Sequence, residues 1–600
     1  MISNHNNNSK NLWSTFGKIL NKNKIKHKKI NNLYINDEKI TEPQDLASSF
    51  NNFFSEIGEC LANKFPNNDN SEYKKYLGSI AQQSMLLYRI QQKEIRDTIN
   101  HLQNKNSSGH DDFSTKFVKI SSPLLIPALT LIFNLSICTG VYPSNLKIAK
   151  VIPIFKKGDP SSVNNYRPIS ILSTINKIFE KILYTRIINY INKSNLLYKY
   201  QYGFRKNHST EHALTEIVDQ IRFSIDDKKM TCGIFIDLSK AFDTVNHQIL
   251  LGKLEHYGIA GKALDLIKSY LNERKQYVQI DKSKSQTRTV SCGVPQGSVL
   301  GPLFFLLFIN DLPNCCPSGK VRIFADDTNV FFQCDNNEDI KIIGNTIMTQ
   351  LCSWFSANKL TLNSDKSSFT IFKSNRKKIQ DLPEHIDFLN QKIRRTTHIK
   401  FLGVTLDEGL TWTQHINELC SKLKSLFHIF YNIRSYLSKE NIKTIYYTLI
   451  YSRIKYGISL YGQAGKAKIN KIQTLQNQLL KVLSKKNYRF STDELHKEFD
   501  ILKVEDVVKQ ETLTFIHNYF DDKLPPVFNK YFETFETCHH RNTRSGANKI
   551  KPPNHKTTTA ALSIRIKGAS LWNKLNNELK SISNTKTFRN KYKRSILDSY

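Results

Sequence analysis

Two adjacent aspartates, Asp326 and Asp327, interrupt the apolar stretch VRIFADDTNVFF, residues 321–332. A two-residue hairpin turn explains their position, because aspartate tolerates the backbone angles of a turn. It does not explain the choice of two neighbouring carboxylates, which repel one another. A divalent cation between carboxylates offsets that repulsion, and Mg²⁺ prefers oxygen ligands. The pair therefore indicates either a simple turn or part of a metal site.

A third carboxylate, Asp237, ends an apolar run within GIFIDLSKAFDTV, residues 233–245. A carboxylate at a strand end can face one at the tip of a neighbouring hairpin. Such a cluster can hold two metal ions about 3.5–4 Å apart and stabilise the attacking and leaving oxygens of phosphoryl transfer. A helix N-cap is the alternative role for Asp237. We interpret Asp243 as an ordinary surface carboxylate.

The composition is strongly basic, with 87 Lys and Arg residues against 52 Asp and Glu residues and a net charge of +35. Such a charge is self-repulsive unless a polyanion neutralises it. Nucleic acid is the favoured partner, and an anionic membrane surface is the second. The stretch KNKIKHKK (22–29) indicates either a nuclear-import or RNA-contacting patch or a solvated basic tail.

The 10 cysteines are scattered and include no CxxC pair, so zinc-ribbon spacing is absent and a reduced, intracellular protein is expected. Residues 538–540, Cys-His-His, resemble half of a metal site, but the sequence offers no second half. The apolar stretches 123–138 and 302–309 predict buried helices rather than membrane spans. The first contains prolines and polar residues, and the second is too short.

Short β-rich runs alternate with helical stretches between 231 and 406, which predicts an α+β fold with an antiparallel sheet. The expected strands are 231–238, 275–280, 321–325, 328–333, 368–372 and 400–407, with an earlier strand and turn over 149–160. From about 412 onward the chain is largely helical. Ser438 is the expected N-cap of a helix with one apolar face, formed by Ile442, Ile445, Tyr446 and Leu449.

Six sequence blocks, taken in order, resemble the reverse transcriptase of non-LTR (LINE-type) retrotransposons. The blocks are KVIPIFKKGDPSSVNNYRPIS and its continuation (150–183), QYGFRKNHST (201–210), FIDLSKAFDTVNH (235–247), GVPQGSVLGPLFFLLFINDL (293–312), FADD (324–327), and LTLNSDKSS (360–368) followed by KFLGVTLD (400–407). A weaker likeness to the jockey and CR1 groups continues through 456–483, TRSG (543–546) and SLWNKL (570–575).

The resemblance implies a right-hand polymerase fold with a mostly helical C-terminal region. The expected regions are an N-terminal extension and connector (1–90), fingers (91–230), a palm with an antiparallel sheet (231–410), a helical thumb (411–485) and a basic C-terminal region (486–600), with the reverse transcriptase domain spanning about 130–410. Complete members of the family carry an upstream endonuclease. Only about 90 residues precede the polymerase region here, so we expect this chain to lack that nuclease.

The same resemblance implies the catalytic residues. Asp237 and Asp326 are the expected ligands of two Mg²⁺ ions, with Mn²⁺ as an alternative, and the backbone carbonyl of Leu238 is a further oxygen ligand. Asp327 completes the carboxylate cluster beside the primer end. Lys366 is the expected general acid that protonates the leaving pyrophosphate.

Spacing leaves Lys359 and Lys373 open for that role, and a merely solvated Lys366 is the other possibility. Five further residues are implied to bind the incoming dNTP: Lys156, Lys157, Arg167, Phe242 and Gln296. The three cations grip the triphosphate. The ring of Phe242 lies under the sugar and clashes with a ribose 2′-OH, unless it is a plain core aromatic. Gln296 packs near the base, in a loop whose Gly293 and Gly297 permit close approach, unless that loop is a simple turn.

The function implied is an RNA-directed DNA polymerase that adds dNTPs to a primer 3′-OH on an RNA template. Its expected partners are template RNA, a DNA primer or target and dNTPs, without a membrane, in the nucleus or a cytoplasmic ribonucleoprotein. A catalytically inactive, nucleic-acid-binding relic of the same fold is the first alternative, and loss of catalytic carboxylates would favour it. A group II intron-type maturase is the second, and the FADDT sequence disfavours it.

Overall fold

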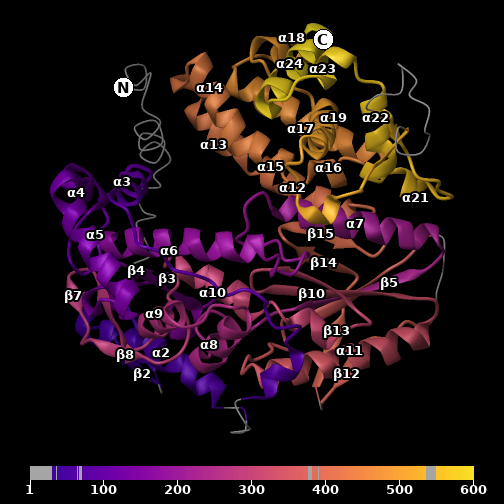
Figure 1. Ribbon diagram of the computed structural model, residues 1–600. Coiled ribbons are helices and arrows are strands. Elements are labelled where there is room, and N and C mark those ends of the chain that lie inside the picture. The colour runs from indigo at the N-terminus through magenta and orange to yellow at the C-terminus, as the bar shows by residue number, and fades with distance from the viewer. Residues whose placement is uncertain are drawn as a thin grey trace.

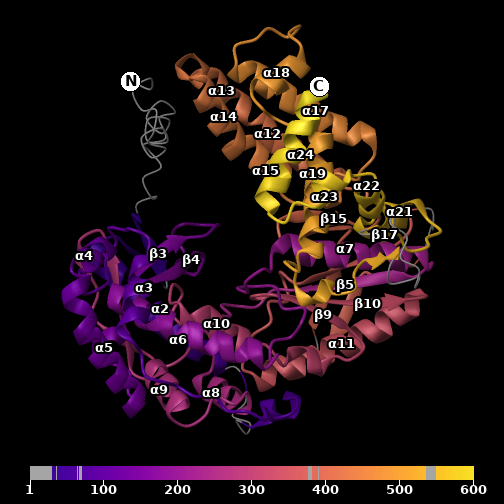
Figure 2. The same ribbon diagram turned by 45° about the horizontal axis from the view of Figure 1, so that its top comes forward.

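The structure is a computed structural model, and it describes residues 30–35, 37–63, 65, 71–375, 381–389, 391–535 and 549–600. Several sequence features lie outside these residues: the basic stretch 22–29, the Cys-His-His run 538–540 and the TRSG block 543–546. Figure 2 shows two lobes that stand apart at one end and join at the other through the region of α8, α10 and α11.

A six-stranded sheet forms the centre of the second lobe. Its order is β12 (His385–Phe388), β13 (Gln391–Arg395), β11 (Ser368–Phe372), β5 (Met230–Ile236), β10 (Asp327–Cys334) and β9 (Lys320–Phe324). All neighbours are antiparallel except β11 and β13. The predicted antiparallel sheet is therefore confirmed, apart from that one parallel pair.

Alternation along the strands gives this sheet two apolar faces. Ile234 and Val330 face a core that includes α11 (Asn337–Ala357). Phe235 and Phe331 face the opposite core, which includes α7 (Thr210–Asp226). The sheet thus lies between α7 and α11, as Figure 1 shows. The central strand β5 is buried along its whole length, so a carboxylate that follows it directly is fixed in place by the core.

The first lobe contains a second, five-stranded sheet. Its strands are β4 (Tyr166–Ile171), β3 (Ile148–Phe155), β6 (Arg274–Ile280), β7 (Ser283–Lys284) and β8 (Arg288–Val290), the last paired with β6. Helix α2 (Pro43–Ala62) packs on this sheet, with Phe50 and Phe54 against Val151 and Val278. Helix α2 of the expected N-terminal extension is therefore part of this core.

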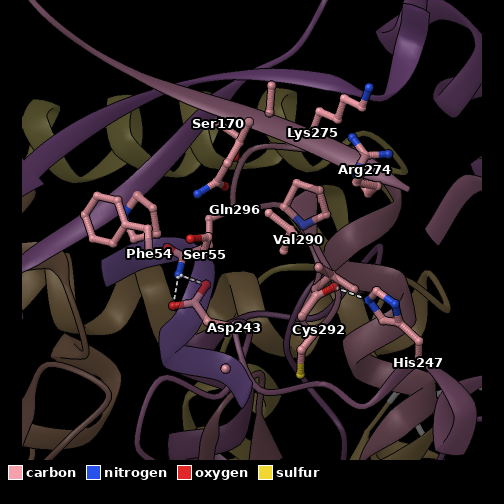
Figure 3. A pocket seen from close by; sticks show the side chains of 17 residues that line it. Phe54, Ser55, Ser170, Asp243, His247, Arg274, Lys275, Val290, Cys292 and Gln296 are labelled. Carbon is pink, nitrogen blue, oxygen red and sulfur yellow. Dashed lines mark hydrogen bonds between the residues drawn. The ribbon is translucent and has the colours of Figure 1, made fainter. Parts of the chain in front are cut away.

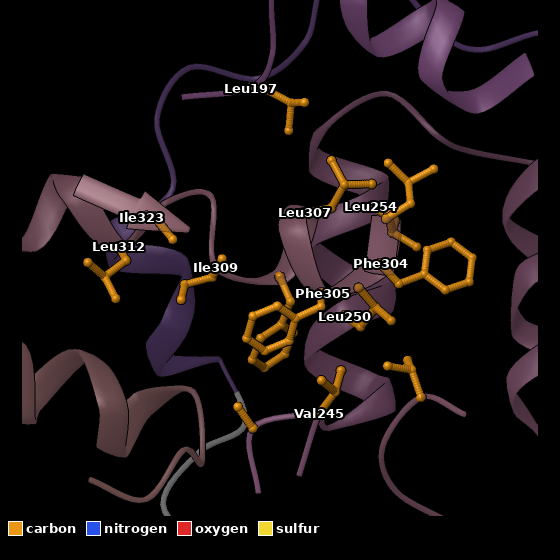
Figure 4. Close-up of a cluster of buried hydrophobic side chains, with 14 of the residues drawn as sticks. Leu197, Val245, Leu250, Leu254, Phe304, Phe305, Leu307, Ile309, Leu312 and Ile323 are labelled. Atoms are coloured by element: carbon orange, nitrogen blue, oxygen red, sulfur yellow. The ribbon is translucent and has the colours of Figure 1, made fainter. Parts of the chain in front are cut away.

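The apolar stretch 302–309 forms α10 (Leu300–Phe308), which is buried as predicted. Figure 4 shows Phe304, Phe305 and Leu307 of α10 packed against Leu250 and Leu254 of α8 (His247–His256). The remaining helices of this lobe are α3 (Gln92–Asn100), α4 (Thr115–Ile120), α5 (Ser122–Thr139), α6 (Thr174–Lys193) and α9 (Lys262–Leu271).

Helix α5 departs from its predicted burial. Its inner face packs on α3 and α9, but only 28% of the helix is buried. Leu124, Leu131 and Leu135 are exposed at 85%, 73% and 61%. The prediction of a buried helix was wrong for this outer stripe. By length and composition alone, α5 is the one helix among the described residues that could cross a membrane.

The chain after 412 is largely helical, as predicted, whereas the expected single strand 400–407 is instead part of a two-stranded hairpin. A small hairpin of β14 (His398–Phe401) and β15 (Val404–Asp407) precedes α12 (Thr413–Lys424), α13 (Leu426–Ile433), α14 (Lys439–Ile445), α15 (Ser452–Lys455), α16 (Ile458–Tyr461), α17 (Lys466–Leu483), α18 (Thr492–Glu498), α19 (Val504–Phe520), α21 (Thr558–Ala561), α22 (Ala569–Asn573), α23 (Asn577–Lys580) and α24 (Thr585–Asp598). Ser438 caps α14 by accepting a hydrogen bond from the Asn441 N–H, as predicted. One apolar cluster runs from Phe401 to Leu597 and includes α7.

Candidate active site

The register of the central sheet brings the three predicted carboxylates to one edge. Ile236 of β5 pairs with Thr328 of β10, so the next residue, Asp237, lies beside Asp327. Phe324 pairs with Asp327 and closes a two-residue turn. Asp326 occupies that turn after Ala325, which takes the left-handed backbone conformation with φ 57°. Strand pairing therefore holds together carboxylates that are far apart in the sequence.

The QYGF segment packs directly on this turn. The Tyr202 N–H donates to the Ile323 carbonyl at 2.8 Å, and the Ile323 N–H donates to the Tyr200 carbonyl at 3.1 Å. A Cβ at Gly203 would lie 2.4 Å from the Ala325 nitrogen, which only glycine avoids. The QYGF segment is thus built into the edge of the hairpin that carries Asp326 and Asp327.

The carboxylates interact electrostatically. The pKa of Asp327 rises to about 6 because the surrounding protein desolvates its carboxylate and because Asp326 and Asp237 add negative charge; Lys156 opposes the shift. Asp326 and Asp327 both keep exposed surface. Hard carboxylate oxygens under mutual repulsion are the donors that Mg²⁺ prefers. Within the residues that the structure describes, however, no three His, Cys, Asp or Glu side chains converge closely enough to hold a metal ion.

The loop after α11 completes this edge. The Asn363 N–H donates to the Asp237 carbonyl at 2.9 Å, and the Ser239 N–H donates to the Thr361 carbonyl at 2.9 Å. These two bonds form the bridge between Leu238 and Leu362. Neither bond uses the carbonyl of Leu238, which is the predicted metal ligand.

Lys366 lies at the carboxylates. Its Nζ is 3.8 Å from Oδ2 of Asp237, and both side chains are about half exposed. Spacing left two other lysines open: Lys359 acts electrostatically on Cys292, and the backbone N–H of Lys373 donates to the Glu408 carbonyl. Position therefore favours Lys366, while its proton-donating role stays a prediction.

The three cations predicted to bind the triphosphate lie on a hairpin of the first lobe. Lys156 and Lys157 follow β3, and Arg167 belongs to β4. The pKa of Lys156 is lowered, first by desolvation and then by the positive charge of Arg167, whereas Asp237 raises it. All three cations are exposed. The hairpin thus places Lys156 within electrostatic reach of Asp237, with Arg167 beside it.

Sequence reasoning missed Lys240. Its Nζ donates to the Asn164 carbonyl at 3.4 Å and to the Tyr166 carbonyl at 3.3 Å, which ties the loop after Asp237 to the cationic hairpin. Its pKa is lowered, chiefly by desolvation. In a chain with so many lysines, the only local signal was its place within LSKAFD.

Phe242 lies in an aromatic cluster. Its ring stacks on Phe305 of α10 at 4.6 Å between centroids, and Phe204 of the QYGF segment meets it edge-on at 6.3 Å. Phe242 is only partly buried. The ring is therefore anchored on the core and keeps an open edge, so both the sugar-sensing and the core-aromatic interpretations agree with its position.

Asp243 is not the ordinary surface carboxylate that the sequence suggested. It is partly buried and accepts two hydrogen bonds from Gln296 Nε2, to Oδ1 at 2.9 Å and to Oδ2 at 3.0 Å. Burial raises its pKa to about 6. Figure 3 shows the pair at a cavity that helix α2 also lines. The prediction failed because the loop that carries Gln296 folds over Asp243 from 53 positions away.

Part of the chain that contains this site matches a known protein family in sequence. Residues 154–406 match the family described as "Reverse transcriptase (RNA-dependent DNA polymerase)". This range includes both lysines of the cationic hairpin, the Gln296 loop and all three clustered aspartates.

Individual relatives indicate which kind of reverse transcriptase the chain resembles. The chain is 28% identical over 74% of its length to the probable RNA-directed DNA polymerase from transposon BS of Drosophila melanogaster, covering 50% of that protein. It is 28% identical to the X-element polymerase of the same fly, with 80% and 52% of the two chains covered. For the polymerase of mobile element jockey the identity is again 28%, with 72% and 48% covered. The resemblance to non-LTR reverse transcriptases is therefore confirmed. The chain spans about half the length of these relatives.

Proposed function

We propose that the chain is an RNA-directed DNA polymerase of a non-LTR retrotransposon. The observation that carries the proposal is the sheet register that sets Asp237 beside Asp327 and the Asp326 turn, with Lys366 at the same edge. The family match over 154–406 and the relatives' names support it. Its partners are an RNA template, a DNA primer and dNTPs, and the net charge of +35 favours such polyanions.

Each side chain has a defined task in this proposal. Lys156, Lys157 and Arg167 hold the triphosphate, and Gln296 packs near the base. The ring of Phe242 excludes a 2′-OH. Lys366, whose Nζ lies 3.8 Å from Oδ2 of Asp237, delivers a proton to the leaving pyrophosphate.

Asp237, Asp326 and the carbonyl of Leu238 are the groups that would hold the divalent ions. Mg²⁺, or Mn²⁺ in its place, supplies positive charge to the attacking and leaving oxygens when bound. The oxygen donor set fits such ions. The pKa of Asp327 is raised first by desolvation and then by the negative charges of Asp326 and Asp237, and a bound cation would relieve that repulsion.

In the regional scheme, residues 91–230 act as fingers, 231–410 as palm and 411–485 as thumb. Figure 2 supports this scheme for the cationic hairpin and the helical region, which stand on opposite lobes. The strands β6, β7 and β8, within the palm range, lie in the first lobe, and α7, within the fingers range, packs on the central sheet. Residues 486–600 share one apolar cluster with the thumb helices and with α7. We therefore assign them to the support of the thumb.

Primer extension on poly(rA)/oligo(dT) with Mg²⁺ tests the function. The wild-type chain incorporates dTTP, and Asp326→Asn loses at least about 10³-fold of the rate, because one charged ligand is removed from a site that acts by charge stabilisation. Asp335→Asn, at the other end of β10 and exposed, is the matched control and retains full activity. Equal incorporation by wild type and Asp326→Asn refutes the proposal.

The relic hypothesis predicts another outcome in the same experiment. A binding-only protein retains tight, salt-sensitive RNA binding, but neither Mg²⁺ nor Mn²⁺ supports extension. The presence of all three carboxylates disfavours it.

A further inference from the structure

Gln296 is held both at its backbone and at its side chain. Its backbone carbonyl accepts a hydrogen bond from the Ser170 N–H of β4 at 2.8 Å. Its Nε2 donates to both carboxylate oxygens of Asp243, at 2.9 and 3.0 Å. Because a carboxylate only accepts, the NH₂ group must face Asp243 and the amide oxygen must face away. The two hydrogen bonds to Asp243 therefore determine that the amide oxygen, not the NH₂ group, is turned toward a neighbouring molecule.

Hydrogen bonds join the two loops that carry Asp243 and Gln296. The Val294 N–H donates to the Phe242 carbonyl at 2.8 Å, and the Gly293 N–H donates to the Val245 carbonyl at 2.8 Å. His247 Nε2 reaches the Gly293 carbonyl at 2.7 Å, as the dashed line in Figure 3 shows. Phe242, the residue before Asp243, is thus tied to the loop of Gln296.

Helix α2 closes the far side of this unit. A Cβ at Gly58 would lie 2.3 Å from the Asp243 carbonyl oxygen and 3.2 Å from Cβ of Cys292. Phe54 and Ser55 of the same helix line the cavity in Figure 3, together with Asp243 and Gln296. The N-terminal helix therefore limits how far the Asp243 loop can retreat.

We propose that Asp243 is a positioning residue for nucleotide selection, which holds the Gln296 amide in one orientation against the incoming dNTP. This inference rests on the proposed polymerase function. Asp243 itself does not touch the nucleotide; it acts through Gln296, and α2 braces it from behind. Two residues far apart in the sequence, Asp243 and Gln296, then act as one unit in dNTP recognition.

Steady-state kinetics of Asp243→Asn test this role. An asparagine side chain offers one acceptor oxygen and sets its own NH₂ against that of Gln296. We expect the KM for dTTP to rise about tenfold, the equivalent of one charge-assisted hydrogen bond, while kcat changes less than about threefold. Asp227→Asn, at the exposed end of α7, is the matched control and leaves both constants unchanged. An unchanged KM in Asp243→Asn overturns the inference.

A double-mutant cycle shows whether the effect runs through Gln296. Gln296→Ala raises the KM by itself, and adding Asp243→Asn to Gln296→Ala raises it no further, because the group that Asp243 positions is already gone. Additive effects of the two changes overturn the inference. A loss of kcat at unchanged KM also overturns it, because that pattern belongs to a damaged fold or catalytic centre.

The same four proteins are compared by thermal unfolding, which needs no activity. Coupling between the two changes in the melting temperature establishes the contact in solution, and absence of coupling overturns the inference. An inactive wild-type protein refutes the proposed function itself. An active wild type with an uncoupled pair leaves the function standing and removes only the role of Asp243.

Discussion

Asp243 has a titration that can be followed without substrate. Its pKa is raised from 3.8 to about 6, mainly by burial, with Gln296 and Lys240 opposing the shift. The folded protein therefore holds a proton that the unfolded chain releases between about pH 4 and pH 6. Stability from this group is present at low pH and is lost as the pH rises through that window.

The direction of this pH dependence of stability can be measured. Asp243→Asn lacks the titration, so the stability of wild type relative to Asp243→Asn falls from pH 4 to pH 6.5, by on the order of 1–3 kcal/mol. Melting temperatures of both proteins across this range check it. The difference between wild type and the exposed control Asp227→Asn stays flat. A difference that grows in favour of wild type with rising pH contradicts the prediction.

Phe242 has its own test. If its open edge senses the sugar, Phe242→Ala increases ribonucleotide incorporation relative to deoxyribonucleotide incorporation by roughly ten- to a hundredfold, since steric rejection in a packed pocket has about that size. Competition assays with rUTP and dTTP measure the ratio. Phe113→Ala, which removes an exposed ring, leaves it unchanged. If Phe242 only packs on Phe305, the ratio stays constant and stability alone falls.

At the residue scale, the sequence allowed Asp237 and Asp326 to be predicted as metal ligands, because carboxylates are unusual beside apolar strands and because the surrounding blocks are distinctive. It failed for Asp243 because no local pattern reveals that another loop will fold over a carboxylate. Lys240 was not predicted, for a different reason. Its side chain bonds to two backbone carbonyls of the β3–β4 hairpin, and a linear sequence does not show which backbone groups a lysine will reach.

At the scale of elements, Gly58 of α2 can be contrasted with Gly465, the residue before α17. Gly58→Ala sets a methyl group against the Asp243 carbonyl and destabilises the protein by about 1–3 kcal/mol, as overpacking does. Gly465→Ala is the matched control, because nothing lies within 4 Å of its Cβ position and its φ is −54°. Thermal unfolding of both variants checks the prediction. Equal melting temperatures contradict the close packing of α2.

Helix α5 provides a second matched pair. Phe133 is fully buried and stacks on Phe179 at 4.4 Å, so Phe133→Ala destabilises by about 3–5 kcal/mol. Leu131, two positions away, is exposed, and Leu131→Gln changes stability by less than about 0.5 kcal/mol. Denaturation of the two variants compares the faces directly. A large loss in Leu131→Gln shows that the outer stripe is covered.

The sequence predicted most strands, because period-two alternation and β-branched residues are local signals. It did not predict their order across the sheet, nor the parallel pairing of β11 with β13, because pairing depends on which distant segments bury one another. It predicted burial for α5 because a helix that is apolar all round usually lies inside a core.

At the scale of the molecule, the charge of +35 controls association. Affinity for an RNA–DNA duplex falls by about 10³-fold or more between 50 and 200 mM KCl if six or more phosphates are contacted. Fluorescence anisotropy with a labelled duplex measures the slope. Affinity that is independent of salt contradicts a phosphate-dominated interface.

The sequence blocks suggest outlines for the regions, which stay predictions, and they do not indicate how the regions contact one another. Residues on both sides of the expected boundary at 485 share one apolar cluster. The buried Asp219 accepts a hydrogen bond from the Tyr531 hydroxyl at 2.6 Å, and Asp226 accepts one from Thr557 Oγ1 at 2.7 Å. These contacts join α7 to residues more than 300 positions away, which no local pattern could indicate.

The contacts of α2 and α7 also determine how the chain can be shortened for expression. A fragment cut at 154 and 406 would contain the whole family match. It would, however, lose the helix that covers Val278, and it would leave Asp219 and Asp226 without their partners from the C-terminal region. Truncations that begin before Pro43 and retain residues to 600 preserve both contacts. Protease-resistant fragments should therefore be much longer than the matched range.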